Sequence, residues 1–117
     1  MKVLEIMKIL DADILVGENQ LKKNITGGGG ADLMEDVLAA ALKSALLLTG
    51  VVSEQMIKTA ITAGVGAVVF VRGKKPDEMI LDLAFKNRLP VLLTRHTMFV
   101  SCGRLYVKGL RGPDGAW

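Results

Sequence analysis

Three short apolar runs of this 117-residue sequence each end in residues that could bind an anion. Hydroxyl groups, glycines and cations follow the runs directly, at points where a helical pattern is about to begin. In an open parallel sheet, ligands bind beyond the carboxyl ends of the strands, where helix N-termini and glycine backbone can approach a phosphate. Arginine and lysine add charge-assisted hydrogen bonds to such a group. The candidate binding residues at these positions are Thr49, Gly50, Arg72, Gly73, Lys74, Thr94, His96 and Thr97.

The same residues also have a purely structural interpretation. Arg72, Lys74 and Lys75 would then be solvated surface charges, and Thr97 would be the N-cap of the helix that follows. The sequence leaves both interpretations open. If the residues do bind, the predicted ligand is a small anion such as a nucleotide.

Four consecutive glycines, Gly27–Gly30, precede another helical pattern without forming a known phosphate loop. Neither G-x-G-x-x-G nor G-x-x-x-x-G-K-[ST] is matched, because Asp32 occupies the third-glycine position and no lysine follows. Asp32, Glu35 and Asp36 would each repel a phosphate by about 3 kcal/mol at roughly 5 Å, against about 1 kcal/mol from the helix end. We therefore expect a flexible loop, with Asp32 capping the helix together with Glu35. The alternative is that Asp32 accepts hydrogen bonds from a hydroxyl or exocyclic amine of the ligand.

Few residues could support catalysis or metal binding. His96 is the only histidine, and Cys102, the only cysteine, lies on an apolar helical face where we expect a buried, inert thiol. Ser53 and Ser101 have no evident base beside them. The sequence therefore predicts no catalytic residue, no metal site and no cofactor. A small phosphotransfer or hydrolytic enzyme that uses His96 and Asp32 is an alternative.

Apolar runs of strand length alternate with amphipathic patterns of helix length along the chain. Continuous apolar strands of this kind are typical of parallel strands buried on both faces in an α/β domain. The expected strands lie in residues 14–16, 45–50, 67–73 and 90–95. The expected helices lie in residues 3–10, 32–42, 53–64, 76–88 and 98–109.

Individual residues mark the ends and the buried faces of these helices. Ser53 is the expected N-cap of one helix, and Gly64 is expected to end that helix in a left-handed conformation. Pro76 is the expected first residue of the next helix. The apolar spacing predicts that the following side chains are buried: Met79, Ile80, Leu83 and Ala84 in one helix, and Met98, Phe99, Cys102, Leu105 and Tyr106 in the last.

Length and composition restrict the class of protein. A chain of 12.5 kDa forms one domain, and half of its residues are hydrophobic whereas 23% are charged. No apolar run reaches the roughly 18–20 residues of a membrane span, and a single cysteine fits a reducing cytoplasm. Residues 1–71 have a net charge of −2 and residues 72–117 one of +5, so the basic surplus is local. Since interleaved aromatics, zinc-ligand spacing and a DNA-reading helix are missing, we expect no binding to nucleic acid. Since no apolar run is long enough to span a bilayer, we expect no membrane association.

Several stretches resemble a DRTGG domain, and together they extend over residues 1–110. They are Gly30–Ala39, Leu46–Gly50, Val69–Pro76, Leu92–Thr94 and Met98–Tyr106. The sequence departs from the D-R-T-G-G signature, since Asp32-Leu33-Met34 stands where its acidic start is expected. The resemblance implies a three-layer α/β sandwich with a mainly parallel sheet, similar to the N-terminal domain of bacterial HPr kinase. Residues 1–110 would form this single domain, followed by a frayed tail at 111–117.

The resemblance also implies a class of function. DRTGG domains accompany nucleotide-binding CBS domains, phosphotransacetylases and a pyrophosphatase in regulatory and often dimeric roles, and no catalytic residues are established for them. We therefore expect a cytoplasmic, non-catalytic regulatory module that forms a homodimer, with Met34 and Met98 as candidate interface residues. The alternative is an interaction or scaffold module that binds a protein partner, because stand-alone relatives often accompany iron-only hydrogenase and serine-kinase-like genes.

Overall fold

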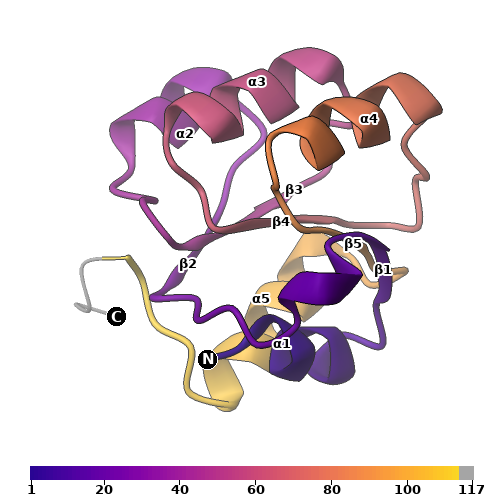
Figure 1. Cartoon of the computed structure of the whole chain (residues 1–117). Coiled ribbons are helices and arrows are strands. Elements are labelled where there is room, and N and C mark those ends of the chain that lie inside the picture. Colours follow the sequence, from indigo (N-terminus) through magenta and orange to yellow (C-terminus); the bar gives the residue numbers. More distant parts are fainter. Residues whose placement is uncertain (114–117) are drawn as a thin grey trace.

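A five-stranded sheet forms the centre of the computed structural model, which describes residues 1–113 (Figure 1). Its strands are β1 (Asp13–Val16), β2 (Gly28–Gly30), β3 (Leu46–Thr49), β4 (Ala67–Phe70) and β5 (Val91–Leu93). They lie in the order β1-β5-β4-β3-β2, in which β2 to β5 are parallel and β1 is antiparallel beside β5. The expected α/β fold with a mainly parallel sheet is therefore confirmed.

Helices cover both faces of the sheet and complete three layers. The helices α2 (Met34–Ala39), α3 (Glu54–Thr62) and α4 (Glu78–Lys86) connect successive parallel strands and lie on one face (Figure 1). The helices α1 (Val3–Ile9) and α5 (Met98–Val107) lie on the other face, and the short 3-10 helix η1 (Glu18–Gln20) follows β1. Side chains alternate along the strands between the two cores, as in Leu47 and Leu48 of β3.

Polar side chains cap α3 and α4 at or next to the residues that the sequence predicts. The Ser53 hydroxyl accepts a hydrogen bond from the Met56 N–H at 3.1 Å and caps α3, and Gly64 follows that helix with a φ of +71°. The Asp77 carboxylate accepts from the Ile80 N–H at 3.0 Å. Because Asp77 is the cap, α4 begins at Glu78 and not at Pro76 as expected.

The glycine run is a strand, and the expected flexible loop is wrong. Gly28–Gly30 pair in parallel with Leu46–Leu48 at the edge of the sheet. A Cβ on Gly28 would lie 2.8 Å from Leu110 Cδ2, and a Cβ on Gly30 would lie 2.8 Å from Met98 Sδ. Glycine is a poor strand former in general. Here the absence of a side chain lets Leu110 and Met98 pack directly onto the strand.

The chain continues past α5 along the same edge strand. The Gly28 N–H donates to the Arg111 carbonyl oxygen at 2.9 Å. This contact places residues 111–113 beside β2. Residues 114–117, the rest of the tail predicted from the sequence, lie outside the described residues.

The buried faces of α4 and α5 are narrower than the sequence pattern predicts. Ile80 and Ala84 of α4 are buried as predicted, but Met79 is 64% exposed. In α5 Leu105 is buried, whereas Phe99 is 88% exposed. Each of these helices contacts the sheet with one side only, so a residue about 100° away around the helix points to solvent. Tyr106 of α5 and Leu38 of α2 are exposed for the same reason, and α2 ends before Leu42.

None of the helices in residues 1–113 combines the length and the hydrophobicity needed to cross a bilayer.

Candidate functional site

The carboxyl ends of the four parallel strands bring the predicted binding residues to one edge of the sheet. Because β2, β3, β4 and β5 are neighbours in chain order, the segments that follow them lie in the same order along this edge. The strand order does not reverse between them, so the edge is a continuous rim instead of a crevice between two halves. The rim residues are Asp32 after β2, Thr49 and Gly50 after β3, Arg72, Gly73 and Lys74 after β4, and Thr94, His96 and Thr97 after β5.

Asp32 joins the ends of β2 and β3 and does not cap α2. Its Oδ1 accepts hydrogen bonds from the Gly50 N–H at 2.8 Å and from the Thr49 hydroxyl at 3.2 Å. The residue before α2 is Leu33, which makes no side-chain cap. The predicted capping box with Glu35 is therefore wrong, because the carboxylate is used between strands. Thr49 is fully buried, so its hydroxyl serves the fold.

Arg72 and Gly73 form a left-handed turn at the end of β4, with φ angles of +66° and +68°. Their N–H groups donate to the carbonyl oxygens of His96 and Thr94, each at 2.8 Å, which ties this turn to the end of β5. A left-handed conformation costs a non-glycine residue about 1–2 kcal/mol. The guanidinium lies beside β3, since a Cβ on Gly50 would be 2.9 Å from Arg72 Nη2.

The two predicted threonines after β5 hold the backbone in place. Thr94 is buried, and its hydroxyl donates to the Leu10 carbonyl oxygen at 2.7 Å and accepts from the His96 N–H at 3.3 Å. The Thr97 hydroxyl accepts from the Val100 N–H at 3.3 Å and caps α5. The structural interpretation of Thr97 is therefore confirmed, and Thr94 has a structural role as well.

A cavity of about 420 Å³ opens at this edge beside β1 and β5. Cations, carboxylates and the histidine share its lining, which consists of Leu10, Asp11, Asp13, Gly73, Lys75, Leu93, Arg95 and His96. Lys74 is exposed and lies outside this lining. Among residues 1–113, no group of three or more His, Cys, Asp or Glu side chains could hold a metal ion. The cavity therefore presents separate donors and acceptors to a ligand.

Four charged residues of this cavity are not among the candidates chosen from the sequence. Lys75 and Arg95 adjoin predicted candidates, so their position after an apolar run was a usable signal. Asp11 and Asp13 had no such signal, because they belong to the segment of β1. They reach the site only because β1 pairs antiparallel with β5, with Asp13 opposite Leu93.

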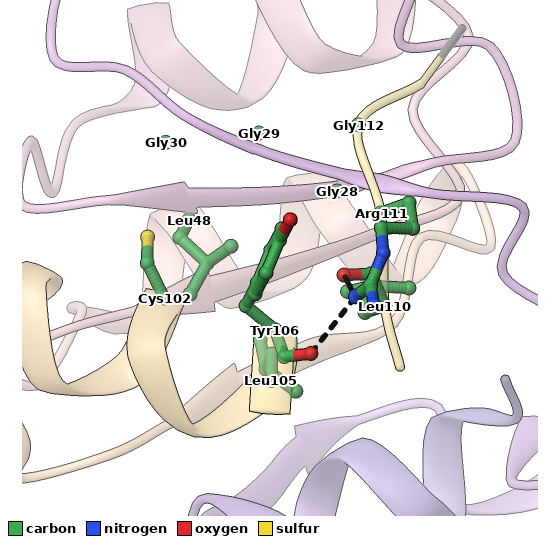
Figure 2. Close-up of a pocket in the computed structure, with 10 residues that line it drawn as sticks. All are labelled: Gly28, Gly29, Gly30, Leu48, Cys102, Leu105, Tyr106, Leu110, Arg111 and Gly112. Atoms are coloured by element: carbon green, nitrogen blue, oxygen red, sulfur yellow. Dashed lines mark hydrogen bonds between the residues drawn. The ribbon is translucent and has the colours of Figure 1, made fainter. Parts of the chain in front are cut away.

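A second cavity, of about 220 Å³, lies between β2 and α5 (Figure 2). Its lining is mainly apolar and includes Leu48 and Leu105 beside the glycines of β2. The Arg111 guanidinium lies 4.1 Å from the centre of the Tyr106 ring and donates to the Tyr106 carbonyl oxygen at 2.9 Å. Cys102 also lines this cavity and is half-buried, so the thiol is less buried than the sequence predicts.

Cys102 should react slowly with an electrophile in the native protein. Burial raises the pKa of its thiol, so less of the nucleophilic thiolate is present at pH 8 than for a free cysteine. We expect iodoacetamide to modify Cys102 several-fold more slowly in the native chain than in urea, after normalisation to N-acetylcysteine in each solvent. Mass spectrometry of timed samples measures this ratio. Equal normalised rates would contradict the effect of burial.

The same fold occurs in a solved regulatory region. It is the crystal structure of the CBS and DRTGG domains of the regulatory region of Clostridium perfringens pyrophosphatase, complexed with the activator diadenosine tetraphosphate. The superposition has a TM-score of 0.76 at 21% sequence identity and covers 97% of this chain and 49% of that chain. This chain therefore spans about half the length of the solved one. At this level of identity the similarity shows the fold.

Sequence comparison gives the family. No curated protein sequence matches the chain. The model of the DRTGG domain matches residues 5–105, which is most of the sequence and includes all of the rim residues. The chain therefore belongs to the DRTGG domain family.

Proposed function

We propose that this chain is a non-catalytic regulatory domain that binds a small anionic, nucleotide-like ligand at the carboxyl ends of its parallel strands. The observation that carries the proposal is the cavity beside β5, where Lys75, Arg95 and His96 share one lining with Asp11 and Asp13. The cations can bind phosphate oxygens, and the carboxylates can accept hydrogen bonds from ribose hydroxyls or an exocyclic amine. A nucleotide offers both kinds of group in one small molecule, whereas inorganic phosphate offers only the first.

Arg72 extends this site along the rim toward β3. Its backbone is held in a conformation that glycine adopts more readily, and hydrogen bonds to the end of β5 maintain it. Strain of this kind concentrates at binding sites. An exposed arginine at such a position supports a role for the guanidinium in holding the anionic part of the ligand.

Asp32 and Thr94 already form hydrogen bonds within the fold, which supports ligand binding without catalysis. Asp32 Oδ1 already accepts two hydrogen bonds, and the Thr94 hydroxyl both donates and accepts. Among the rim residues, Arg72 and Lys74 offer cations that suit the binding of an anion. We therefore expect no turnover of a bound nucleotide in the native chain, and none for His96→Ala to remove.

Membership of the DRTGG family supports a regulatory role. The Clostridium perfringens pyrophosphatase contains DRTGG and CBS domains in its regulatory region, which was solved with an activator bound. In this chain, ligand binding at the rim would be the regulatory signal. The single half-buried thiol fits the reducing cytoplasm in which we place the domain.

The proposal includes a homodimer. Leu33 and Leu38 are 61% and 56% exposed at α2, and association would remove them from water. Met34 and Met98, the interface residues expected from the sequence, are only partly exposed and pack against the two cores. A standard interface buries about 800 Å² of each partner. That is a modest share of the 6514 Å² surface of this chain.

A thermal-shift titration combined with sedimentation tests the proposed function. The probes are AMP, ATP, adenosine and inorganic phosphate. We expect both nucleotides to raise the Tm, with about 2.7 kcal/mol of stabilisation at a hundredfold excess over the Kd, and adenosine or phosphate alone to give smaller shifts. Sedimentation should give twice the 12.5 kDa mass of the chain.

Two results would contradict parts of this proposal. No shift with either nucleotide, in a sample that sediments as a dimer, would favour an interaction module over a ligand sensor. Nucleotide turnover that disappears in His96→Ala would show an enzyme.

A further inference from the structure

A groove of about 520 Å³ lies between α1 and α5. Both helices lie on the face of the sheet opposite α2, α3 and α4 (Figure 1). Among the residues that the structure describes, its lining combines apolar side chains with cations and includes no carboxylate. The lining residues are Lys8, Ile9, Val100, Gly103, Arg104, Val107 and Lys108.

An apolar stripe on α5 forms one side of this groove. Val100, Gly103 and Val107 follow one another at spacings of three and four residues, which places them on the same side of the helix. Val107 is 83% exposed, and Val100 is also exposed. The stripe is therefore turned toward solvent and away from the sheet that Leu105 contacts.

Packing within residues 1–113 does not explain the glycine in this stripe. A Cβ on Gly103 would meet none of their atoms within 4 Å, whereas a Cβ on Gly28, Gly30 or Gly66 would lie within 3 Å of a neighbour. Glycine is also a poorer helix former than alanine. A notch at this point, between two exposed valines, allows another molecule to approach the α5 backbone closely.

The charges around the groove indicate which kind of molecule fits. A second copy docked through the same face would bring Lys8, Arg104 and Lys108 close to their own symmetry mates, and like charges disfavour such an interface. A partner with carboxylates beside an apolar stripe would complement both features. An amphipathic helix presents this pattern through apolar residues at i, i+3 or i+4, and i+7.

We propose that the groove between α1 and α5 binds an acidic amphipathic helix of a protein partner, and that Gly103 admits its close approach. The apolar stripe of the partner would cover Val100 and Val107. Its carboxylates would face Lys8, Arg104 and Lys108. This site is separate from the proposed nucleotide site, and it gives the domain a surface through which a protein could be bound.

A titration of the ¹⁵N-labelled full chain with two peptides tests this proposal. The first is a helical peptide of about 18 residues, or five turns, with leucine along one side and glutamate on both flanks. The second has every glutamate replaced by lysine. We expect the glutamate peptide to bind about tenfold more tightly or better, and to shift the amides of α1 and α5 most strongly.

Matched variants separate the groove from a general charge effect. Gly103→Leu should lower the affinity for the glutamate peptide by about tenfold, because the leucine fills the notch. It should not lower the Tm, since leucine is a better helix former than glycine and the added Cβ has open space around it among residues 1–113. Lys108→Glu should weaken binding, whereas Lys58→Glu, an equal charge change at an exposed position of α3, should not.

Three outcomes would overturn the proposal. They are equal affinity for the two peptides, amide shifts that are strongest outside α1 and α5, and an unchanged affinity for the glutamate peptide in Gly103→Leu. An anionic membrane is the other surface that a basic apolar face could meet. Co-sedimentation with vesicles of phosphatidylcholine and phosphatidylserine that Lys108→Glu weakens and Lys58→Glu does not, without binding of the glutamate peptide, would assign the face to lipid.

Discussion

Arg72→Gly should weaken nucleotide binding and at the same time stabilise the fold. A charge-assisted hydrogen bond contributes about 1.5–3 kcal/mol, so losing the guanidinium should raise the Kd for AMP by roughly 10- to 100-fold. The residue has a φ of +66°, which glycine adopts without steric strain. Relief of that strain, less the greater chain entropy of glycine, should add about 0.5–1 kcal/mol to the free energy of unfolding. Calorimetric titration and urea unfolding measure the two effects.

Arg88→Gly is the matched control for this prediction. Arg88 also has a positive φ, of +54°, but it follows α4 and lines a cavity with Gly17 and Phe85 instead of lying on the rim. The substitution removes the same charge and relieves the same type of backbone strain. It should therefore stabilise the fold similarly and leave the affinity for AMP within about twofold. Equal losses of affinity in the two variants would point to net charge and would remove Arg72 from the site.

Gly66→Ala should destabilise the fold by about 3 kcal/mol, near the upper end for an overpacked site. The added Cβ would lie 2.9 Å from the carbonyl carbon and oxygen of Ser44, which are backbone atoms. Ser44 cannot move away easily, because its carbonyl accepts from the Thr26 N–H at 3.0 Å and its N–H donates to the Gly64 carbonyl at 2.8 Å. Urea unfolding monitored by circular dichroism measures the loss.

Gly103→Ala provides the control with the same chemical change. It lies in a helix, and its new Cβ would meet nothing within 4 Å. The variant should gain about 0.5–1 kcal/mol, the difference between the helix propensities of alanine and glycine. A loss of less than about 0.5 kcal/mol in Gly66→Ala, which is the range of ordinary surface substitutions, would contradict the close packing of Gly66 against Ser44.

The buried strands were predictable because their signal is local. β3, β4 and β5 are continuous apolar runs, and parallel strands covered on both faces require such runs. The helix starts at Ser53 and Thr97 were also readable, since their hydroxyls bond to N–H groups three residues ahead. β2 was not readable, because three glycines have no strand propensity of their own. Its position depends on Leu110 and Met98, which are distant in sequence.

The site was predictable to the same extent as the strands that form it. The carboxyl edge of a parallel sheet follows from strand direction, so Arg72 and His96 could be placed there from sequence. The hydrogen bonds of Asp32 to the β3 end could not, since they need the register of β2 against β3. Asp11 and Asp13 depend on the antiparallel pairing of β1, which no local pattern encodes.

A ¹H–¹⁵N correlation map of the labelled chain, recorded during titration with AMP, tests the central claim most directly. Binding at the rim should shift the amide signals of Gly50, Gly73 and His96 in a saturable way. The amides of Gly17 and Arg88, which line the separate cavity of about 620 Å³, should stay in place. Shifts concentrated at Gly17 and Arg88, or a map that AMP leaves unchanged, would contradict a nucleotide site at the carboxyl ends of the strands.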